Sequence, residues 1–371
     1  MPYSHDHPLL MIPGPVSSQQ NVLDATAARS YAHTEQAFVS GYQTALQNLR
    51  SVFDTSEEYS PLVVAGGGTL AMEIAMINLL DQNLDEKILI CETGYFGDRF
   101  VQMAERFGID YTKLSSPLGQ GISEEDLADT LETGEFDYAF IQHVDTSTGV
   151  ANDIEMFGRI CAEQEVISVV DGVCALGGQE LHQERWEIDI YFSGAQKALA
   201  LPPGLAVLMY SPTARNISER RDYPFPSYYA DLNNWWPVMD AYLDGRSSYF
   251  STPATNLIMG LAQSTENLLE EGMDAVYGRH QKLAERFREE MQDLGFEFVT
   301  DEQYFANTLS TPKYLDPQQG TSFRAKLLEK GVLVAGGIQS GIANTYFRVG
   351  HMGIISDEQI DFTLQAIKSV I

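Results

Sequence analysis

A single lysine stands in the nearly uncharged run "YFSGAQKALALPPG", which spans residues 191–204. Lysine side chains in apolar runs usually extend to water along their methylene stem. A lysine amine that is held partly desolvated instead loses its proton more easily, and it becomes a nucleophile that can form a Schiff base with an aldehyde. Lys197 is therefore the first candidate for covalent chemistry, and the rest of the chain has to decide between the two roles.

Three consecutive glycines at residues 66–68 join the apolar run "LVVA" to the helical pattern "TLAMEIAMINLL". Backbone N–H groups at the start of a helix, together with the helix dipole, favour a bound phosphate. A tight strand-to-helix connection alone would use the same glycines. The stretch therefore predicts an anion cradle only where its surroundings supply the rest of a site.

The glycine run also fits a second interpretation, which is a nicotinamide dinucleotide site. Gly66, Gly68 and Ala71 match the dinucleotide fingerprint loosely, and Glu92 lies near the end of the next strand. Two features count against this interpretation. About 60 residues precede the motif, whereas a dinucleotide-binding unit often opens its domain, and the interpretation leaves Lys197 without a task.

A carboxylate follows a third apolar run, because "VISVV" ends in Asp171. Such a residue can cap a helix or a turn, or it can face a cationic ring nitrogen. Ligands of open parallel sheets bind at the carboxyl ends of the strands, which is where Asp171, Lys197 and the glycine run would meet. A lysine for an aldehyde, an acid for a pyridine nitrogen and a cradle for a phosphate are the groups that pyridoxal 5′-phosphate requires.

Charge and composition narrow the class of protein. The 371 residues carry a net charge of −29, which disfavours binding to nucleic acid or to anionic membranes. Cys91, Cys161 and Cys174 show no metal-ligand spacing, so we expect a reducing, cytoplasmic setting and no metal site. The first residues lack the regions of a signal peptide. Residues 61–80 are apolar enough for a membrane span, but the glycines and Glu73 favour a strand, a turn and a buried helix.

The elements that must position these residues alternate along the chain. Seven short apolar runs between about residues 60 and 211 alternate with amphipathic patterns such as residues 98–108 and 153–164. This alternation predicts an α/β fold with a mostly parallel seven-stranded sheet and helices on both faces. Ser123 with Asp126 marks the start of one of the helices.

The pattern changes after about residue 265. Residues 270–295 predict one long charged helix, and the runs "FEFV", "NTLSTPKY", "VLVAGG" and "TYFRVG" predict strands. Ser356 with Gln359 predicts a capping box for the last helix. Together these elements predict a smaller α+β domain, with further helices at 321–331 and 356–371. We expect three parts: an N-terminal segment (1–16), a large cofactor-binding domain (17–265) and a small C-terminal domain (266–371).

Seven blocks of sequence resemble one known family. They are "PGP", "GGGTLAME", "GYFGDR", "HVDTSTGV", "VVDGVCALGG", "SGAQKAL" with its following "PPG", and "FRVGHMG". The chain resembles the class-V aminotransferases of the pyridoxal-phosphate fold type I group, in particular the alanine–glyoxylate and serine–glyoxylate transaminase branch. The resemblance runs from about residue 11 to the last residue. The specific feature is a lysine 26 residues after the aspartate, with Gln196 before it.

The resemblance implies a role for each matching residue. Lys197 is similar to the Schiff-base lysine, which also moves a proton between the substrate and the cofactor. Asp171 resembles the partner of the pyridinium nitrogen. Phe96 stands where an aromatic ring stacks on the cofactor, and Thr146 where a hydroxyl bonds near its phenolic oxygen. Arg348 resembles the clamp for the α-carboxylate of the substrate, and its planar fork suits that task.

The resemblance also implies a phosphate cradle that two subunits share. Its members on one chain are Gly67, Gly68, Thr69 and Gln196. Tyr249 and Thr252 resemble the residues that a second subunit contributes, so a homodimer with a shared active site is implied. Two departures matter: Gly67 stands where relatives often have Ser, and Phe96 stands where many have Trp. Both substitutions weaken contacts to the cofactor without touching the chemistry.

The function implied is a ping-pong transfer of an amino group. The donor would be a small amino acid such as alanine or serine, and the acceptor a small 2-oxo acid such as glyoxylate or pyruvate. Three alternatives stay open: another pyridoxal-phosphate reaction on the same fold, such as a lyase or desulfurase; a nicotinamide-dependent dehydrogenase; and a partner subunit without activity. A desulfurase needs a mobile cysteine, and no cysteine lies in a suitable polar loop.

Overall fold

Seven strands form the central sheet of this computed structural model, which describes residues 3–80, 86–220 and 227–371. In spatial order the strands are β2 (Ser60–Ala65), β10 (Leu205–Tyr210), β9 (Ile190–Gly194), β8 (Ile167–Asp171), β5 (Tyr138–Gln142), β3 (Ile88–Glu92) and β4 (Tyr111–Ser115). Each of the seven apolar runs has become one strand. All neighbours are parallel except β10, which is antiparallel to β2 and to β9. The predicted sheet is therefore confirmed.

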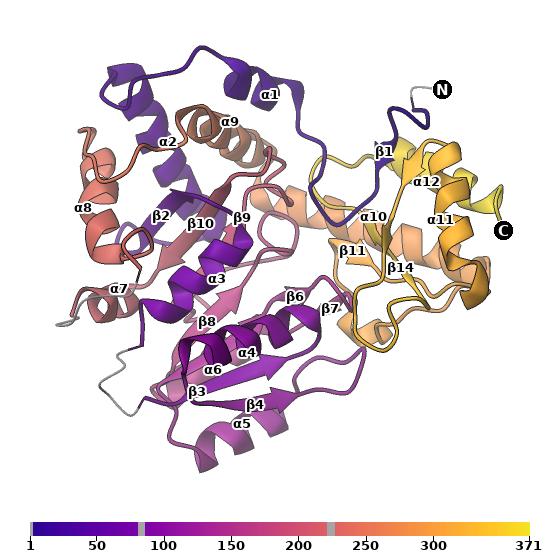
Figure 1. The fold of residues 1–371 in the computed structure, drawn as a ribbon, viewed down its shortest axis with the longest axis horizontal. Coiled ribbons are helices and arrows are strands. Elements are labelled where there is room, and N and C mark those ends of the chain that lie inside the picture. The colour runs from indigo at the N-terminus through magenta and orange to yellow at the C-terminus, as the bar shows by residue number, and fades with distance from the viewer. Residues whose placement is uncertain (1–2, 81–85, 221–226) are drawn as a thin grey trace.

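Helices pack on both faces of the sheet (Figure 1). Adjacent residues of a strand point to opposite faces of the sheet. Two adjacent residues of β9 therefore identify one helix on each face. The ring of Tyr191 meets Phe53 of α2 (Gln36–Phe53) with centroids 5.8 Å apart. The ring of Phe192 meets Phe100 of α4 (Tyr95–Phe107) at 6.2 Å. Remaining helices of this part are α1 (Gln20–Ala27), α3 (Gly68–Ile77), α5 (Glu124–Thr133), α6 (Ile154–Glu163), α7 (Pro212–Glu219), α8 (Leu232–Leu243) and α9 (Thr255–Glu271).

The segment 61–80 forms β2, a tight turn and α3, as its glycines predicted. Within the described ranges, the search for an apolar helix of membrane-spanning length finds no candidate. The Ser123 hydroxyl accepts a hydrogen bond from the backbone N–H of Asp126, so the predicted start of α5 is correct as well.

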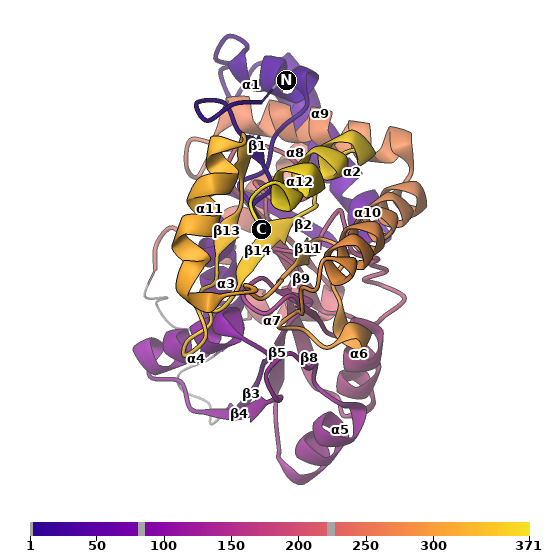
Figure 2. The ribbon, with the colours of Figure 1, turned by 90° about the vertical axis from the view of Figure 1, so that its right-hand side faces the viewer.

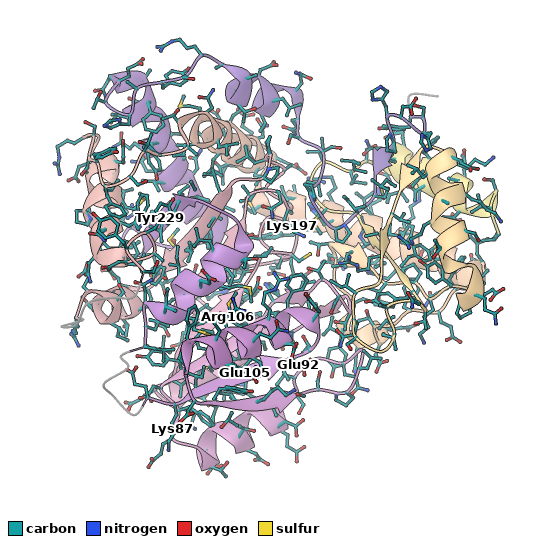
Figure 3. All side chains as sticks on the ribbon, viewed as in Figure 1. Lys87, Glu92, Glu105, Arg106, Lys197 and Tyr229 are labelled. Atoms are coloured by element: carbon teal, nitrogen blue, oxygen red, sulfur yellow. The ribbon has the colours of Figure 1, made fainter. Side chains whose placement is uncertain are left out.

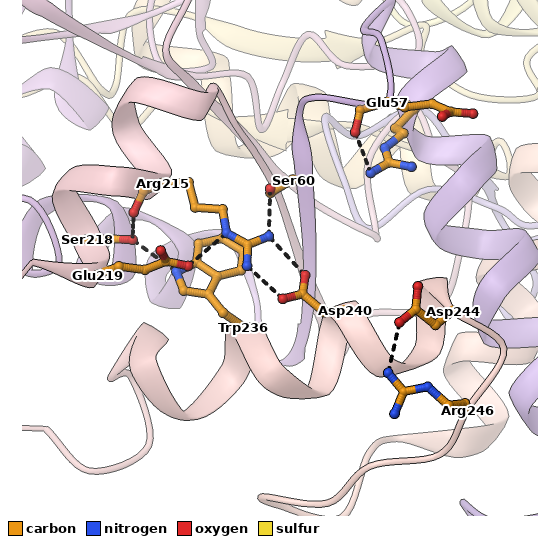
Figure 4. Close-up of polar contacts among 10 residues, drawn as sticks. Glu57, Ser60, Arg215, Ser218, Glu219, Trp236, Asp240, Asp244 and Arg246 are labelled. Carbon is orange, nitrogen blue, oxygen red and sulfur yellow. Dashed lines mark hydrogen bonds and ion pairs between the residues drawn. The ribbon is translucent and has the colours of Figure 1, made fainter.

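One arginine joins the edge strand to the helices beside it. Arg215 of α7 forms a two-pronged ion pair with Asp240 of α8 at 2.7 and 2.9 Å, and it also donates to Ser60 at the start of β2 (Figure 4). Its guanidinium carbon lies 4.9 Å from the ring centroid of Trp236. Bidentate pairs of this kind are stronger than single contacts, so Arg215 fixes α7 and α8 against the antiparallel edge.

A second hydrophobic cluster lies beside the sheet domain. It includes residues of α10 (Met273–Asp293), α11 (Gly320–Glu329) and α12 (Asp357–Lys368), which face the viewer in Figure 2. Short strands accompany them: β11 (Leu309–Ser310), β12 (Val332–Leu333), β13 (Ala335–Gly336) and β14 (Phe347–Gly350). The capping box of Ser356 and Gln359 is present. The exact domain boundaries stay a prediction.

Three details differ from the sequence-based expectation. The long helix begins at Met273 and not at residue 270, because Gly272 with φ +85° ends α9 and separates the two helices. The run "FEFV" forms only an isolated bridge between Phe298 and Pro312. The N-terminal segment is part of the second cluster, because β1 (Leu9–Leu10) pairs in parallel with β12. A strand of two residues carries no periodic signal that a sequence could show.

Candidate active site

A cavity of about 210 Å³ lies where the parallel strands end. Its lining comes from the strand ends and from the first turns of α3 and α4: Gly68, Thr69, Met72, Phe96, Arg99, Val144, Thr146, Asp171, Val173, Cys174, Gln196 and Lys197. Seven of the eleven predicted site residues are among them. Gly67 is the residue before α3, so it borders the same wall.

Lys197 lies in the cavity wall between the sheet domain and the second cluster (Figure 3). Its amine donates a hydrogen bond to the carbonyl oxygen of Pro13 in the N-terminal segment. Gly14 has φ +96°, and a Cβ atom there would lie 2.5 Å from Cδ and 2.9 Å from Nζ of Lys197. The N-terminal segment can therefore pass this closely over the amine only with glycine at position 14.

Asp171 ends β8 and is 4% exposed. Its Oδ1 accepts a hydrogen bond from the backbone N–H of Val173 at 2.8 Å. Burial raises the pKa of this carboxyl to about 7, with a smaller contribution from Asp145, while Arg99 and Lys197 act in the opposite direction. A buried carboxylate with one hydrogen bond favours a cationic partner inside the cavity.

The start of α3, where the glycines predicted an anion cradle, borders the cavity. A Cβ atom on Gly67 would meet no heavy atom within 4 Å, so this position opens onto free space. A Cβ atom on Gly194 would lie 2.9 Å from Oε1 of Gln196 and 3.1 Å from the backbone nitrogen of Gly68, which places the Gln196 amide close to the helix start. Among the described residues, Oε1 of Gln196 is buried without a hydrogen-bond partner. The site thus offers polar groups that no protein atom uses.

Phe96 in the first turn of α4 is positioned by two residues that sequence reasoning missed. The carboxylate of Asp145 accepts hydrogen bonds from the backbone N–H groups of Phe96 and Gly97, at 2.9 and 3.3 Å. The hydroxyl of Ser147 accepts from Tyr95 and donates to Asp145. Side-chain oxygens at a helix start satisfy N–H groups that lack partners. The signal was present in "DTSTG", because Asp145 and Ser147 flank the one residue that was singled out.

Arg348 projects from β14 toward the same rim. Its Nε donates to the carbonyl oxygen of Gly336 at 2.8 Å, and its Nη1 donates to that of Thr146 at 3.4 Å. Burial lowers the pKa of the guanidinium, which stays charged at neutral pH. No carboxylate of the described residues lies within ion-pair distance of Arg348, so a structural ion pair does not account for it.

Tyr249 and Thr252 do not reach the cavity of their own chain. The side chain of Tyr249 is 61% exposed, and its ring packs against His33 with centroids 5.2 Å apart. Its hydroxyl lies 3.5 Å from Oγ1 of Thr252. Their contribution to the site of a second subunit stays a prediction.

Five lining residues were not predicted, and two of them, Arg99 and Cys174, carry ionisable side chains. Cys174 is 1% exposed, and burial raises the pKa of its thiol, so it forms a protonated part of the wall. A desulfurase requires a mobile thiolate, which this buried residue does not supply. Arg99 lies one turn after Phe96 on α4, and the motif "GYFGDR" includes it although only its aromatic residue was singled out.

Comparison with known proteins gives consistent matches. The family model described as aminotransferase class-V matches residues 16–355. The chain is 30% identical to an alanine–glyoxylate aminotransferase of Saccharomyces cerevisiae, over 93% of this chain and 92% of that protein. It is 27% identical to an L-aspartate–glyoxylate aminotransferase of Paracoccus denitrificans, over 94% and 87%. A crystal structure of an alanine–glyoxylate aminotransferase from Nostoc sp. superimposes with a TM-score of 0.92 at 30% identity, covering 100% of this chain and 96% of that one.

Proposed function

The chain belongs to the class-V aminotransferase family, and we propose that it binds pyridoxal 5′-phosphate and transfers an amino group from a small amino acid to a small 2-oxo acid. The observation that carries this proposal is the meeting of Lys197, Asp171 and the start of α3 in one cavity. The alternative of a nicotinamide dehydrogenase does not fit, because β2 lies at the sheet edge and pairs only with the antiparallel β10. A dinucleotide-binding unit begins with parallel strands.

The residues present fit the cofactor. The neutral cradle at Gly67, Gly68 and Thr69 would take the phosphate through its N–H and hydroxyl donors. The Gln196 side chain lies beside it and could donate from its amide NH2 group. Asp171 would hold the ring nitrogen, because a cation there would relieve the cost of burying its carboxylate. Phe96 would pack on the ring, and its place is fixed by the Asp145 cap.

When bound, pyridoxal phosphate supplies an aldehyde and an electron sink that weakens the Cα–H bond of the amino acid. Lys197 would take the Cα proton at Nζ and return it at the cofactor, because it lines the cavity that would hold both. Arg348 would bind the α-carboxylate and so orient the Cα–H bond. Thr146 lines the cavity, its backbone oxygen accepts a hydrogen bond from Arg348, and its hydroxyl would bond the cofactor's phenolic oxygen.

We place alanine or serine as the donor and glyoxylate or pyruvate as the acceptor. The relatives named for glyoxylate support a small acceptor. The test is a screen in which the visible absorption band of the loaded protein is followed with each amino acid. Loss of the band with alanine or serine supports the proposal, and a protein that takes up no pyridoxal phosphate would refute it.

Arg348→Lys should weaken the binding of amino and oxo acids. Lysine keeps the charge but loses the two-pronged geometry, and one charge-assisted bond contributes about 1.5–3 kcal/mol. We expect KM for both substrates to rise about tenfold or more, while the dissociation constant for pyridoxal phosphate stays nearly unchanged. Steady-state kinetics and cofactor titration check this. An unchanged KM, or loss of cofactor in its place, would remove Arg348 from its proposed role.

We also propose a cytoplasmic homodimer in which Tyr249 and Thr252 enter the neighbouring site, and this proposal predicts sensitivity to salt. Two chains of net charge −29 repel each other at low ionic strength. The Debye length is about 30 Å at 0.01 M salt and about 3 Å at 1 M. We expect low salt to loosen the dimer and release cofactor before the subunits unfold. Light scattering and cofactor absorbance at both salt concentrations measure this, and an equally tight, loaded dimer with the same Tm would contradict it.

A further inference from the structure

Arg99 is the one lining residue of the cavity that carries a charge and has no task in the proposed reaction. Its Nη1 donates a hydrogen bond to Oγ1 of Thr69 at 3.1 Å. Its guanidinium carbon lies 4.6 Å from the ring centroid of Phe96 and 5.3 Å from that of Tyr95. Arg99 therefore joins the cradle at the start of α3 to the aromatic residue that would face the cofactor ring.

No carboxylate of the described residues lies within ion-pair distance of Arg99, and Asp171 in the same cavity interacts with its charge only at longer range. The planar guanidinium has five N–H donors in a fixed arrangement, and a single donor is occupied by Thr69. Stacking over Phe96 holds the plane of the group in place. An arginine that two neighbouring side chains hold in place, and that keeps unused N–H donors, is well suited to bind an anion.

The cradle itself lacks a cation. Gly67, Gly68, Thr69 and Gln196 are neutral, and so are Tyr249 and Thr252, which a second subunit would bring. A phosphate monoester carries about −1.5 to −2 charges at pH 7. The helix dipole supplies only about half a positive charge, and the chain as a whole carries −29. A positive group close to Thr69 would therefore strengthen the binding of a phosphate.

We propose that Arg99 is the counter-ion of the cofactor phosphate, and that its contacts with Thr69 and Phe96 orient it for this task. The inference rests on the proposed function, since it assumes that the cavity takes pyridoxal phosphate. Arg99 compensates for the hydroxyl that the cradle lacks at Gly67. It is a binding residue for the phosphate and takes no part in proton transfer.

The test distinguishes an effect of Arg99 on phosphate binding from an effect on binding of the cofactor ring. Cofactor-free wild type, Arg99→Gln and Arg99→Lys are titrated with pyridoxal 5′-phosphate and, separately, with pyridoxal, which lacks the phosphate. We expect Arg99→Gln to raise the dissociation constant for pyridoxal phosphate at least tenfold, equivalent to about 1.4 kcal/mol. The constant for pyridoxal should change less than about twofold, and Arg99→Lys should recover part of the loss, because it restores the charge without the fork.

A matched control comes from the same helix. Arg106 lies in the last turn of α4 and is exposed (Figure 3), so Arg106→Gln removes an equal charge without touching the cavity. This variant should bind pyridoxal phosphate like the wild type. Thermal unfolding of the cofactor-free variants shows whether each one is folded. If Arg99→Gln does not fold, the comparison of Arg99→Lys with the wild type still tests the proposal.

The outcomes distinguish this inference from the proposed function. A wild type that fails to bind pyridoxal phosphate refutes the proposed function. If the wild type binds it and Arg99→Gln binds equally well, the inference on Arg99 is refuted and the proposed function stands. An equal loss for pyridoxal and for pyridoxal phosphate would also refute it, because Arg99 would then act on the ring through Phe96 and not on the phosphate.

Discussion

Lys197→Ala is expected to abolish amino transfer and the covalent capture of pyridoxal phosphate. Alanine has no amine to bond the aldehyde or to carry the Cα proton, and loss of a positioned proton carrier alone costs about 10²–10⁴-fold in rate. The fold should remain, because the Lys197 amine makes a single hydrogen bond within the described part of the chain, to the carbonyl of Pro13. The measurement is kcat together with mass spectrometry after borohydride reduction, which should find the cofactor on the peptide containing Lys197 in the wild type alone.

Lys113→Ala serves as the control for this experiment. Lys113 lies on β4, is 43% exposed at its side chain and pairs loosely with Glu92 at 3.8 Å. Its removal deletes the same charge at a residue that does not line the cavity, and activity should stay near that of the wild type. Full activity in Lys197→Ala, or reduction that attaches the cofactor to another lysine, would overturn the role of Lys197.

Asp171→Asn should have two opposite effects. In the loaded enzyme it removes the negative charge at the ring nitrogen, and we expect kcat to fall at least about 100-fold, as for the loss of other electrostatic contacts in active sites. In the cofactor-free protein it should stabilise the fold at pH 8. Asparagine keeps the acceptor for the Val173 N–H group, but it cannot carry the buried charge.

The raised pKa of Asp171 determines how the free energy of unfolding of the cofactor-free protein changes with pH. Burial places this pKa at about 7 in the folded chain, against an ordinary value of 3.8. At pH 3 and below, the carboxyl is largely neutral in both states and costs almost nothing. As pH rises from 3 through 7, the unfolded chain releases the proton first, so the wild type loses stability, by up to about 4 kcal/mol for this group. Asp171→Asn should therefore exceed the wild type in free energy of unfolding at pH 8 and match it near pH 3. A variant that is less stable than the cofactor-free wild type at pH 8 would contradict the stated cause.

The sequence predicts the sheet domain well because its signals are local. Each strand is a short apolar run of five or six residues between turns, and each of the seven runs became a strand. The strand order and the antiparallel direction of β10 depend on pairing between distant segments, so no single run could indicate them. The same holds for the parallel pairing of β1 with β12, which joins segments more than 300 residues apart.

The residues of the candidate site also fall into two groups, those that the sequence could predict and those that it could not. Lys197 and Asp171 were recognisable because a charged residue in an apolar run is unusual. Asp145 was missed because its task is to bond the backbone of α4, and such a contact exists only once the two segments meet. Arg99 was missed because a helical arginine is ordinarily a solvated surface residue, and only the fold brings it to Thr69.

A single-turnover experiment tests the central claim, amino transfer by the loaded protein, most directly. Protein carrying pyridoxal phosphate is mixed with one equivalent of L-alanine in the absence of an acceptor, and the products are measured before and after glyoxylate is added. If the protein transfers the amino group, alanine should remove the visible band and yield up to one equivalent of pyruvate per site and no free ammonia. Glyoxylate should then restore the band and yield an equal amount of glycine. Release of ammonia, or a band that alanine and serine both leave unchanged, would contradict the account.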